Sequence, residues 1–281
     1  MSARGGRPGL LLGIISFLAV AGCGSDPADD SSVGQGAPVQ TGAPGSGGPG
    51  NGNGIAIPNP GTGGGSGSGT SCKPTFTGRV RDFKASHPDF EGVDQPHEKG
   101  IVLDELKLPE RKPVFSGNPM LKTVHTKADF DQWYNDTPGI NEAFEHTITF
   151  EVAPDGSAVY DDPDFFPIDG RGFGNEGLPH NFGFTFELHM TFRYEGGEHF
   201  NFRGDDDLYV FVNDKLAVDL GGVHAALDGP LDLDKEAARL GITPGNEYPL
   251  DFFQAERHTW ASNFRIESTL KFTNCKPIII P

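Results

Sequence analysis

Three consecutive acidic residues, Asp205, Asp206 and Asp207, lie between two runs of strand-forming residues. Like charges at this spacing repel: two unit charges about 4 Å apart cost roughly 4 kcal/mol near a protein surface. A bound cation would offset the repulsion, and calcium suits the site because it takes about six to eight oxygen ligands. The stretch therefore predicts a calcium site. A solvated turn is the alternative that the residues leave open.

A second group of polar and aromatic side chains follows further along the chain. Trp260 offers an aromatic surface for a sugar ring, and Arg257 and Asn263 could bond sugar hydroxyl groups. Loops on a rigid scaffold commonly carry binding. The alternative is structural: Arg257 would pair with Glu256 or Asp251, and Trp260 would pack in the core. The candidate ligand-binding residues are Glu256, Arg257, His258, Trp260 and His224.

The elements that must position these groups are predicted to be strands. From Phe182 to Tyr194 every second residue is apolar, which is typical of a long half-buried strand. Antiparallel strands with short turns predict an all-β fold, an antiparallel β-sandwich or jelly roll with one or two short helices. The other expected strands are residues 76–83, 145–152, 157–160, 208–212, 215–220, 248–253 and 264–272, and the expected helices are 126–135 and 235–240.

The N-terminal part of the chain is not expected to join this fold. Residues 1–22 carry two arginines and then an apolar run of about a dozen residues, which suits a signal peptide better than a membrane span. Cys23 follows small residues and resembles the lipidated cysteine of bacterial lipoproteins, although ordinary cleavage near Ala21 is the alternative. Residues 23–71 are rich in Gly, Pro and Ser and should form a flexible tether.

We therefore expect a folded domain at residues 72–281, exported and lipid-anchored at a bacterial outer membrane or cell surface. Cys72 and Cys275 bracket that domain, and the oxidising conditions outside the cytosol predict a disulfide between them. The net charge of −17 argues against nucleic acid and anionic lipid as partners. Contact with a membrane is expected through the lipid alone.

Four stretches of the sequence resemble the bacterial fibro-slime domain, which is a relative of the PA14 domain. They lie in order across nearly the whole predicted domain. The third of them, with its adjacent aspartates followed by a strand and a hairpin, also resembles the PA14 pattern itself. The stretches are Arg81 to Glu91, Phe130 to Asp136, Gly204 to His224 and Tyr248 to Ile266.

The resemblance implies roles for the acidic residues. In the carbohydrate-binding PA14 domains of yeast adhesins, two adjacent aspartates joined by a cis peptide ligate calcium, and sugar hydroxyls complete the metal's shell. Asp205 and Asp206 match those positions. Asp207 departs from the pattern, which more often has glycine there, so it is either a further ligand or an outward-facing charge. Asn263 is the candidate third side-chain ligand.

These expectations describe a membrane-tethered, surface-displayed, calcium-dependent carbohydrate-binding or adhesion module, with an extracellular or surface glycan as its partner and no enzymatic activity. A structural protein of the cell envelope or matrix that binds another protein is the main alternative. A glycoside hydrolase needs two carboxyl groups roughly 5 Å or more apart across a cleft. Adjacent aspartates on one turn do not provide that spacing unless a partner such as Glu256 supplies the second group.

Overall fold

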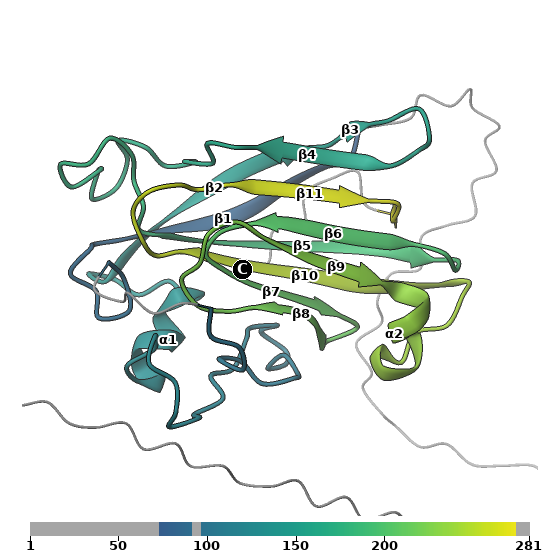
Figure 1. The fold of residues 1–281 in the computed structure, drawn as a ribbon, viewed down its shortest axis with the longest axis horizontal. Helices are drawn as coiled ribbons and strands as arrows, with labels where there is room; N and C mark the ends of the chain where they lie inside the picture. Colours follow the sequence, from purple (N-terminus) through teal and green to yellow (C-terminus); the bar gives the residue numbers. More distant parts are fainter. Residues whose placement is uncertain (1–72, 92–96, 274–281) are drawn as a thin grey trace, which may run out of the picture. The chain divides into compact units, whose positions relative to one another are not determined.

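Two antiparallel sheets make up the computed structural model, which describes residues 73–91 and 97–273 (Figure 1). The elements are β1 (Thr75–Phe83), α1 (Lys127–Trp133), β2 (Asn141–Thr149), β3 (Glu151–Val152), β4 (Ala158–Asp162), β5 (Phe184–Tyr194), β6 (His199–Gly204), β7 (Asp207–Val212), β8 (Lys215–Leu220), β9 (Leu227–Asp232), α2 (Leu233–Leu240), β10 (Asn246–Glu256), β11 (Phe264–Ser268) and β12 (Lys271–Phe272). The first sheet has the order β2-β1-β5-β10-β7-β8, with β12 beside β5. The second sheet has the order β3-β4-β11-β6-β9. The predicted all-β sandwich is confirmed.

The first sheet is buried on both faces near the acidic loop at residues 205–207. On its inner face, Phe186 of β5 and Phe252 of β10 pack against Phe264 of the second sheet. On its outer face, Phe253 of β10 belongs to a second apolar cluster that includes Trp133 of α1. Each fully buried side chain of this size contributes about 1.5–3 kcal/mol relative to exposure. The strands next to the acidic loop are therefore fixed from both sides.

Both predicted helices are present, and local capping explains where they begin. The Thr126 side chain accepts a hydrogen bond from the backbone N–H of Asp129 at 3.1 Å, which caps α1. Asp232 caps α2 in the same way, and Gly241 ends it with φ 70°. Within the described ranges, neither helix has the length and apolarity that crossing a membrane requires.

Strand β9 is not among the elements predicted from the sequence. Its sequence, LDGPLD, contains Gly229 and Pro230, which disfavour a strand because Pro lacks a backbone N–H donor. The strand is at the edge of the second sheet and pairs with β6 alone among the sheet's strands. An edge strand tolerates proline because one side of its backbone needs no partner, which reconciles the sequence with the fold.

Several predictions concern residues outside the described ranges. The signal peptide at 1–22, the tether at 23–71 and the lipidated Cys23 all lie there. So do Cys72 and Cys275, the expected disulfide pair. These assignments remain predictions.

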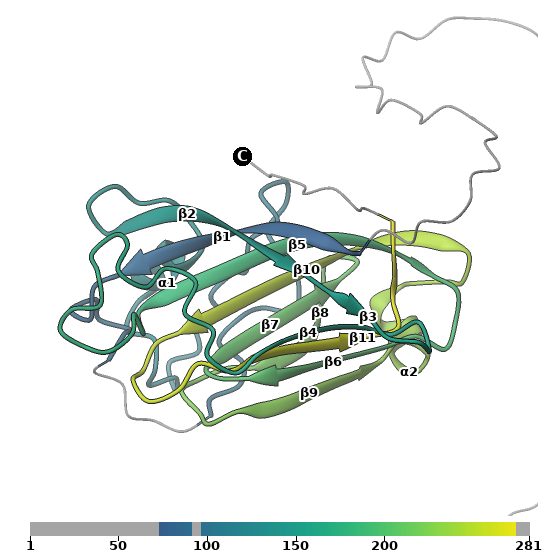
Figure 2. The same ribbon diagram turned by 90° about the horizontal axis from the view of Figure 1, so that it is seen from above.

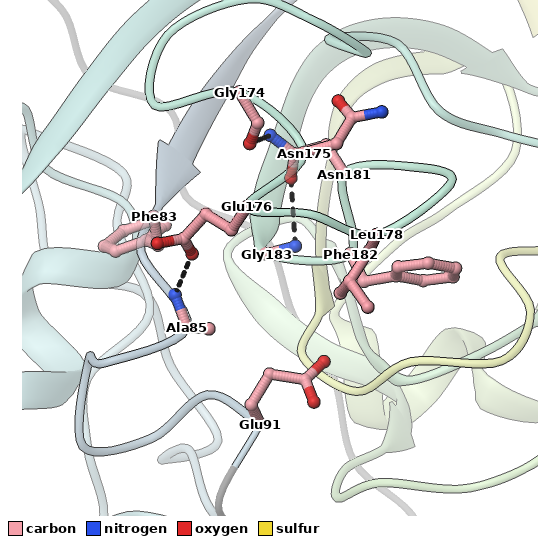
Figure 3. Close-up of a pocket in the computed structure, with 10 residues that line it drawn as sticks. All are labelled: Phe83, Ala85, Glu91, Gly174, Asn175, Glu176, Leu178, Asn181, Phe182 and Gly183. Carbon is pink, nitrogen blue, oxygen red and sulfur yellow. Dashed lines mark hydrogen bonds between the residues drawn. The ribbon is translucent and has the colours of Figure 1, made fainter.

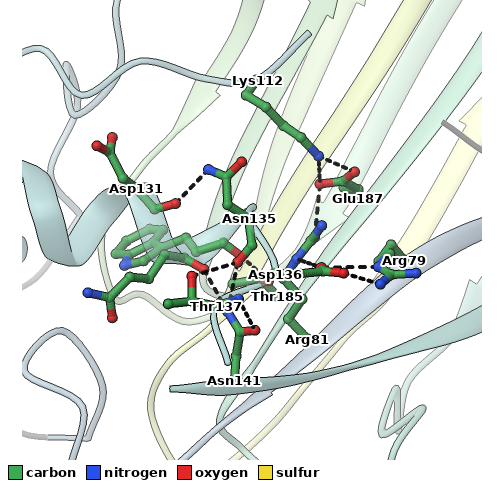
Figure 4. Close-up of polar contacts among 12 residues, drawn as sticks. Arg79, Arg81, Lys112, Asp131, Asn135, Asp136, Thr137, Asn141, Thr185 and Glu187 are labelled. Atoms are coloured by element: carbon green, nitrogen blue, oxygen red, sulfur yellow. Dashed lines mark hydrogen bonds and ion pairs between the residues drawn. The ribbon is translucent and has the colours of Figure 1, made fainter. Parts of the chain in front are cut away.

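A buried ionic network lies on the outer face of the first sheet (Figure 4). Glu187, 3% exposed, accepts hydrogen bonds from Arg81 at 2.9 Å and from Lys112 at 2.6 Å. His189 lies 3.4 Å from Glu187 and 2.7 Å from Asp251. Burial alone would raise the pKa of Glu187, but the His189 hydrogen bond and the charges of Arg81 and Lys112 outweigh it and lower the pKa to about 2.

The network predicts a specific loss of stability in acid. The folded pKa of Glu187 is depressed, so its contribution is complete above the unfolded value of 4.5 and is lost as the pH falls towards about 2. Glu187→Gln should therefore lower the unfolding free energy at neutral pH by about 3 kcal/mol. We expect that difference to narrow steadily below pH 4.5. Urea unfolding of both proteins across this pH range measures it.

The matched control is Glu151→Gln, because Glu151 pairs with Lys73 at the surface and its side chain is 74% exposed. That change should leave the unfolding free energy nearly unaltered at every pH. Parallel pH profiles for the wild type and Glu187→Gln would contradict the assignment.

Candidate ligand-binding and metal site

Four loops of the described chain cross from one sheet to the other at the same end of the sandwich. Strand β6 ends at Gly204 in the second sheet and β7 begins at Asp207 in the first, so Asp205 and Asp206 form the shortest crossover. The loop between β10 and β11 is seen at the left of both ribbon views (Figure 2). The other crossovers are residues 163–183 from β4 to β5, residues 221–226 from β8 to β9, and residues 257–263 from β10 to β11.

Strand pairing fixes the order of these crossovers. In the first sheet β10 lies between β5 and β7, and in the second sheet β11 lies between β4 and β6. Ala255 is paired with Asp207, and Phe264 with Gly204. The loop from β10 to β11 must therefore run beside the two aspartates. The order along the end is 163–183, 257–263, 205–206 and 221–226.

Asp205 and Asp206 line an open cavity of about 480 Å³, although each is only 4% exposed. The peptide bond between them is cis, as the resemblance implies. The Asp205 carboxylate accepts hydrogen bonds from the backbone N–H and the side-chain amide of Asn263, the latter at 3.0 Å. Asp206 accepts from the backbone N–H groups of His224 at 3.0 Å and Arg257 at 3.2 Å. The predicted ligands Asp205, Asp206 and Asn263 are thus brought together.

The electrostatics of Asp205 and Asp206 favour the binding of a cation. Burial raises the pKa of Asp206 to about 7, and the charge of Asp207 adds to the rise. Glu256 is fully buried nearby, and burial together with the charges of Asp206 and Asp205 raises its pKa well above the usual range. Neither carboxylate oxygen of Glu256 has a hydrogen-bond partner among the described residues. Acidic groups this crowded would all be stabilised by a cation.

The donor set also fits a hard cation such as calcium. Two carboxylates and the amide oxygen of Asn263 are oxygen ligands of the kind that calcium prefers. The Asn263 side chain donates from Nδ2 to Asp205, and its Oδ1 atom takes no part in that hydrogen bond. Within the described ranges, no three His, Cys, Asp or Glu side chains converge as a complete metal site. Backbone, water or ligand oxygens would have to complete the shell.

Asp207, unlike Asp205 and Asp206, has a structural role in the core. It is fully buried, and one oxygen accepts a hydrogen bond from Arg257 Nε at 2.6 Å. The other accepts from the Gly222 backbone N–H at 2.7 Å and the Tyr209 hydroxyl at 2.9 Å. Asp207 is therefore neither an outward charge nor a residue of the cavity wall. We leave it out of the candidate metal site.

Arg257 is likewise part of the core and not of a ligand surface. Its side chain is fully buried, and Nη1 donates to the backbone carbonyls of Asp89 at 2.9 Å and Thr123 at 2.8 Å. The alternative prediction for Arg257 was a structural ion pair, and the structure supports an ion pair but with a different acidic residue. The ion pair joins Arg257 to Asp207 and not to Glu256 or Asp251.

The remaining predicted ligand-binding residues divide into two groups. His258, Trp260 and His224 line the cavity with the aspartates, whereas Glu256 is buried and does not. The structural alternative, in which Trp260 packs in the core, is wrong because this side chain is 90% exposed. Its φ of 136° is unusual for an aromatic residue. Such outliers tend to mark functional positions.

One part of this end of the sandwich carried no functional expectation from the sequence. The crossover at 163–183 lies across Trp260 from the aspartates and encloses a second cavity of about 470 Å³. The sequence does contain an indication of function in this segment, because a connection of this length inside a compact domain is usually functional. Its residues on the cavity wall are Pro163, Asp164, Phe166, Leu178, Pro179, His180 and Phe182.

The sequence resemblance singled out the adjacent Asp205 and Asp206, and the structure places them, buried, at a crossover between the two sheets. Residues 168–279 match the model of the PA14 domain. The PA14 match runs from within the 163–183 crossover to beyond β12 and includes Asp205, Asp206 and Asn263. The PA14 part of the resemblance is therefore confirmed for this region.

Two solved PA14 domains are similar to the chain at 11% sequence identity each. One is the PA14 sugar-binding domain from an RTX adhesin, with a TM-score of 0.32 over 69% of this chain and 90% of that chain. The other is the PA14 domain of the MpAFP antifreeze protein, with a TM-score of 0.28 over 72% and 86%.

Curated relatives include proteins of Dictyostelium discoideum. Protein psiR is 36% identical over 202 residues, which is 66% of this chain and 20% of psiR. Protein psiQ is 40% identical over 190 residues, covering 62% of this chain and 19% of psiQ. Protein psiD is 40% identical over 189 residues, covering 62% and 36%. The chain thus spans about a fifth to two fifths of the length of these relatives, which are not the bacterial fibro-slime lipoproteins that the sequence resembles.

Proposed function

We propose that residues 72–281 form a calcium-dependent carbohydrate-binding adhesion module. The observation that carries the proposal is the buried Asp205–Asp206 pair on the wall of an open cavity beside the exposed Trp260. Asp205, Asp206 and Asn263 would hold the ion. A bound calcium ion would offset their charge and offer its remaining coordination positions to hydroxyl groups of a ligand.

The chemistry of the cavity wall supports a glycan as that ligand. A sugar ring presents C–H groups on one face, which pack on an aromatic surface such as Trp260, and hydroxyls around its rim. His258 and His224 supply polar atoms on the same wall. One of the similar PA14 domains is described as sugar-binding, and we extend that property to this chain on the strength of its own site.

A binding role without catalysis is part of the proposal. Hydrolysis of a glycosidic bond needs a second carboxyl group that reaches the scissile oxygen. Glu256 is the nearby candidate, but its side chain is fully buried and does not line the cavity. The arrangement therefore favours holding a sugar over cleaving it.

We further propose display at a bacterial outer membrane or cell surface, with a lipid on Cys23 and a tether at residues 23–71. The support is the sequence of the first 71 residues. A relationship to fibro-slime proteins is part of the same proposal and is carried by the four stretches that resemble them.

A glycan screen in calcium and then in EDTA tests the proposed function, and Trp260→Ala makes the test specific. We expect the variant to lose glycan affinity at least tenfold, because exposed aromatic anchors commonly contribute about 2 kcal/mol or more to binding. Its unfolding free energy should change by less than about 0.5 kcal/mol, since Trp260 is 90% exposed. Met120→Ala, at a residue 76% exposed that lines neither cavity, should alter neither quantity. A wild type that binds no printed glycan in calcium would contradict the proposal.

A further inference from the structure

The exposed Trp260 has little packing of its own to hold it in place. Its side chain is 90% exposed, and its φ of 136° is a conformation that an aromatic residue rarely adopts. A backbone of this kind persists only where the surrounding structure enforces it. The position of the Trp260 ring must therefore be set by the contacts of the residues next to it in the chain.

The residues that follow Trp260 are held by two contacts. The Ser262 backbone carbonyl accepts a hydrogen bond from the Phe165 backbone N–H at 2.9 Å. The Asn263 side-chain amide donates to Asp205 at 3.0 Å. These contacts fix the loop on the C-terminal side of Trp260. The N-terminal side needs a separate anchor.

That anchor is Glu91, which lies in the connection between β1 and α1. One Glu91 carboxylate oxygen accepts a hydrogen bond from the Thr259 backbone N–H at 2.9 Å, and the other accepts from the Thr259 hydroxyl at 3.5 Å. The Glu91 backbone N–H donates to the Arg257 carbonyl at 2.7 Å. The Arg257 backbone N–H in turn donates to Asp206 at 3.2 Å. Glu91 therefore holds the loop at the residue immediately before Trp260 and at the residue that also bonds Asp206.

Glu91 is itself held in place by the core. Phe90 is 1% exposed and stacks on Phe83 of β1, with ring centroids 4.7 Å apart and planes at 17°. Asp89 is fully buried and accepts a hydrogen bond from the indole N–H of Trp133 at 3.0 Å. The side chain that holds the loop thus extends from a part of the chain that the core fixes.

The surroundings of Glu91 give it no direct access to a ligand. It lines neither of the two larger cavities described above. It does line a small hollow against the 163–183 crossover, and Figure 3 shows it without a hydrogen bond to the other residues drawn there. The hollow is about 10 Å³, which has room for roughly one water molecule. A sugar does not fit in that space, so the contacts with the loop define the role of this residue.

We propose that Glu91 is a positioning residue, which fixes the backbone at Thr259 and thereby orders Trp260 for ligand binding. The inference rests on the proposed function, because it concerns the same binding loop. It also gives a role to the stretch Arg81 to Glu91, which resembles fibro-slime domains and lies outside the PA14 match at residues 168–279. An aromatic side chain that is ordered before the ligand arrives loses less conformational entropy on binding.

Fluorescence measures the order of the Trp260 ring without any ligand. The chain has two tryptophans, and Trp133 is fully buried, so time-resolved anisotropy at the red edge of the emission reports mainly on Trp260. The rapidly decaying part of the anisotropy should grow about twofold in Glu91→Ala, because nanosecond motion of the ring is released. Glu91→Gln keeps an oxygen that accepts from the Thr259 N–H and should match the wild type. Trp260→Ala supplies the background from Trp133.

Isothermal titration in millimolar calcium measures the effect on binding. The probe is the glycan that gives the strongest calcium-dependent signal on a printed array. Glu91→Ala should weaken its affinity about two- to tenfold, and Glu91→Gln should bind nearly as well as the wild type. In the Trp260→Ala background the same substitution should have no further effect, because Glu91 acts through that ring. The calcium-induced rise in unfolding temperature should be the same in Glu91→Ala as in the wild type.

The matched control is Glu198→Ala, in the turn between β5 and β6 at the other end of the sandwich. The Glu198 carboxylate also accepts two backbone hydrogen bonds, from Glu195 and Gly196 at 2.8 Å each. Its removal should change neither the anisotropy of Trp260 nor the glycan affinity.

The outcomes separate this inference from the proposed function. Unchanged anisotropy in Glu91→Ala would overturn the inference. An affinity loss of the same size in the wild-type and Trp260→Ala backgrounds would also overturn it, since Glu91 would then act independently of that ring. A wild type that binds no glycan in calcium would overturn the proposed function, and the anisotropy would still decide whether Glu91 holds Trp260.

Discussion

Removal of calcium is expected to lower the unfolding temperature of the protein by about 5–10 °C. A ligand present at 100 times its Kd stabilises the native state by about 2.7 kcal/mol, and each kcal/mol corresponds to about 2–4 °C in a domain of this size. The physical reason is the crowding of buried carboxylates at Asp205 and Asp206, which a cation would relieve. Thermal unfolding in millimolar calcium and in excess EDTA measures the shift.

Asp206→Asn should abolish this response, because the substitution removes a ligand charge at the centre of the site. The matched control is Asp228→Asn, at an exposed residue of β9 that pairs with Arg203 at the surface. The control should keep the full calcium response. A wild type without any shift would mean that the Asp205–Asp206 turn is stabilised by its backbone hydrogen bonds alone. Ligand binding would then depend on the loop at 257–263 without a metal.

The second large effect is expected at Arg257→Met, which should destabilise the protein by about 3–5 kcal/mol. The change leaves Asp207 fully buried without its partner, and an unpaired charge in the core is costly. It also removes the guanidinium that lies over the Trp133 ring at 4.6 Å. Urea unfolding gives the free energy directly.

Two further variants show whether loss of the buried Arg257–Asp207 ion pair causes this destabilisation. Arg265→Met removes an arginine that pairs with Asp161 and Glu267 near the surface, and it should cost less than about 1 kcal/mol. Combining Arg257→Met with Asp207→Leu should recover part of the loss, since no charge is then stranded. Equal costs for Arg257→Met and Arg265→Met would contradict the structural role of Arg257.

The strands and the acidic motif could be predicted because their signals are local. Alternation from Phe182 to Tyr194 identifies β5, since one face of that strand packs in the core. The adjacent Asp205 and Asp206 are recognisable because charge repulsion depends on neighbours in sequence. Their placement beside Asn263 also followed from the resemblance, and the structure brings these groups into hydrogen-bond contact.

The errors concern contacts between residues far apart in sequence. Nothing local shows that Arg257, the first residue after β10, points into the core towards Asp207, whereas Trp260 three residues later is exposed. The cavity of about 470 Å³ beside the 163–183 crossover is harder still to predict, because its walls come from two crossovers that residues 184–256 separate in the chain. Pairing of β10 with both β5 and β7 creates these proximities, and a single sequence does not specify which strands become neighbours.

The row of crossovers has a consequence for how this protein can diversify. The loops at 163–183 and 257–263 begin and end on β4, β5, β10 and β11, which are internal strands of the two sheets, so the exposed loop positions can change while the sheets remain intact. Leu178 and Trp260 are such positions, since they are 39% and 90% exposed. New ligand preferences can therefore arise by exchange of a few loop side chains, at little thermodynamic cost. Arg257 lies three residues before Trp260 but is fully buried in an ion pair with Asp207, so exchange at that position would strongly destabilise the domain.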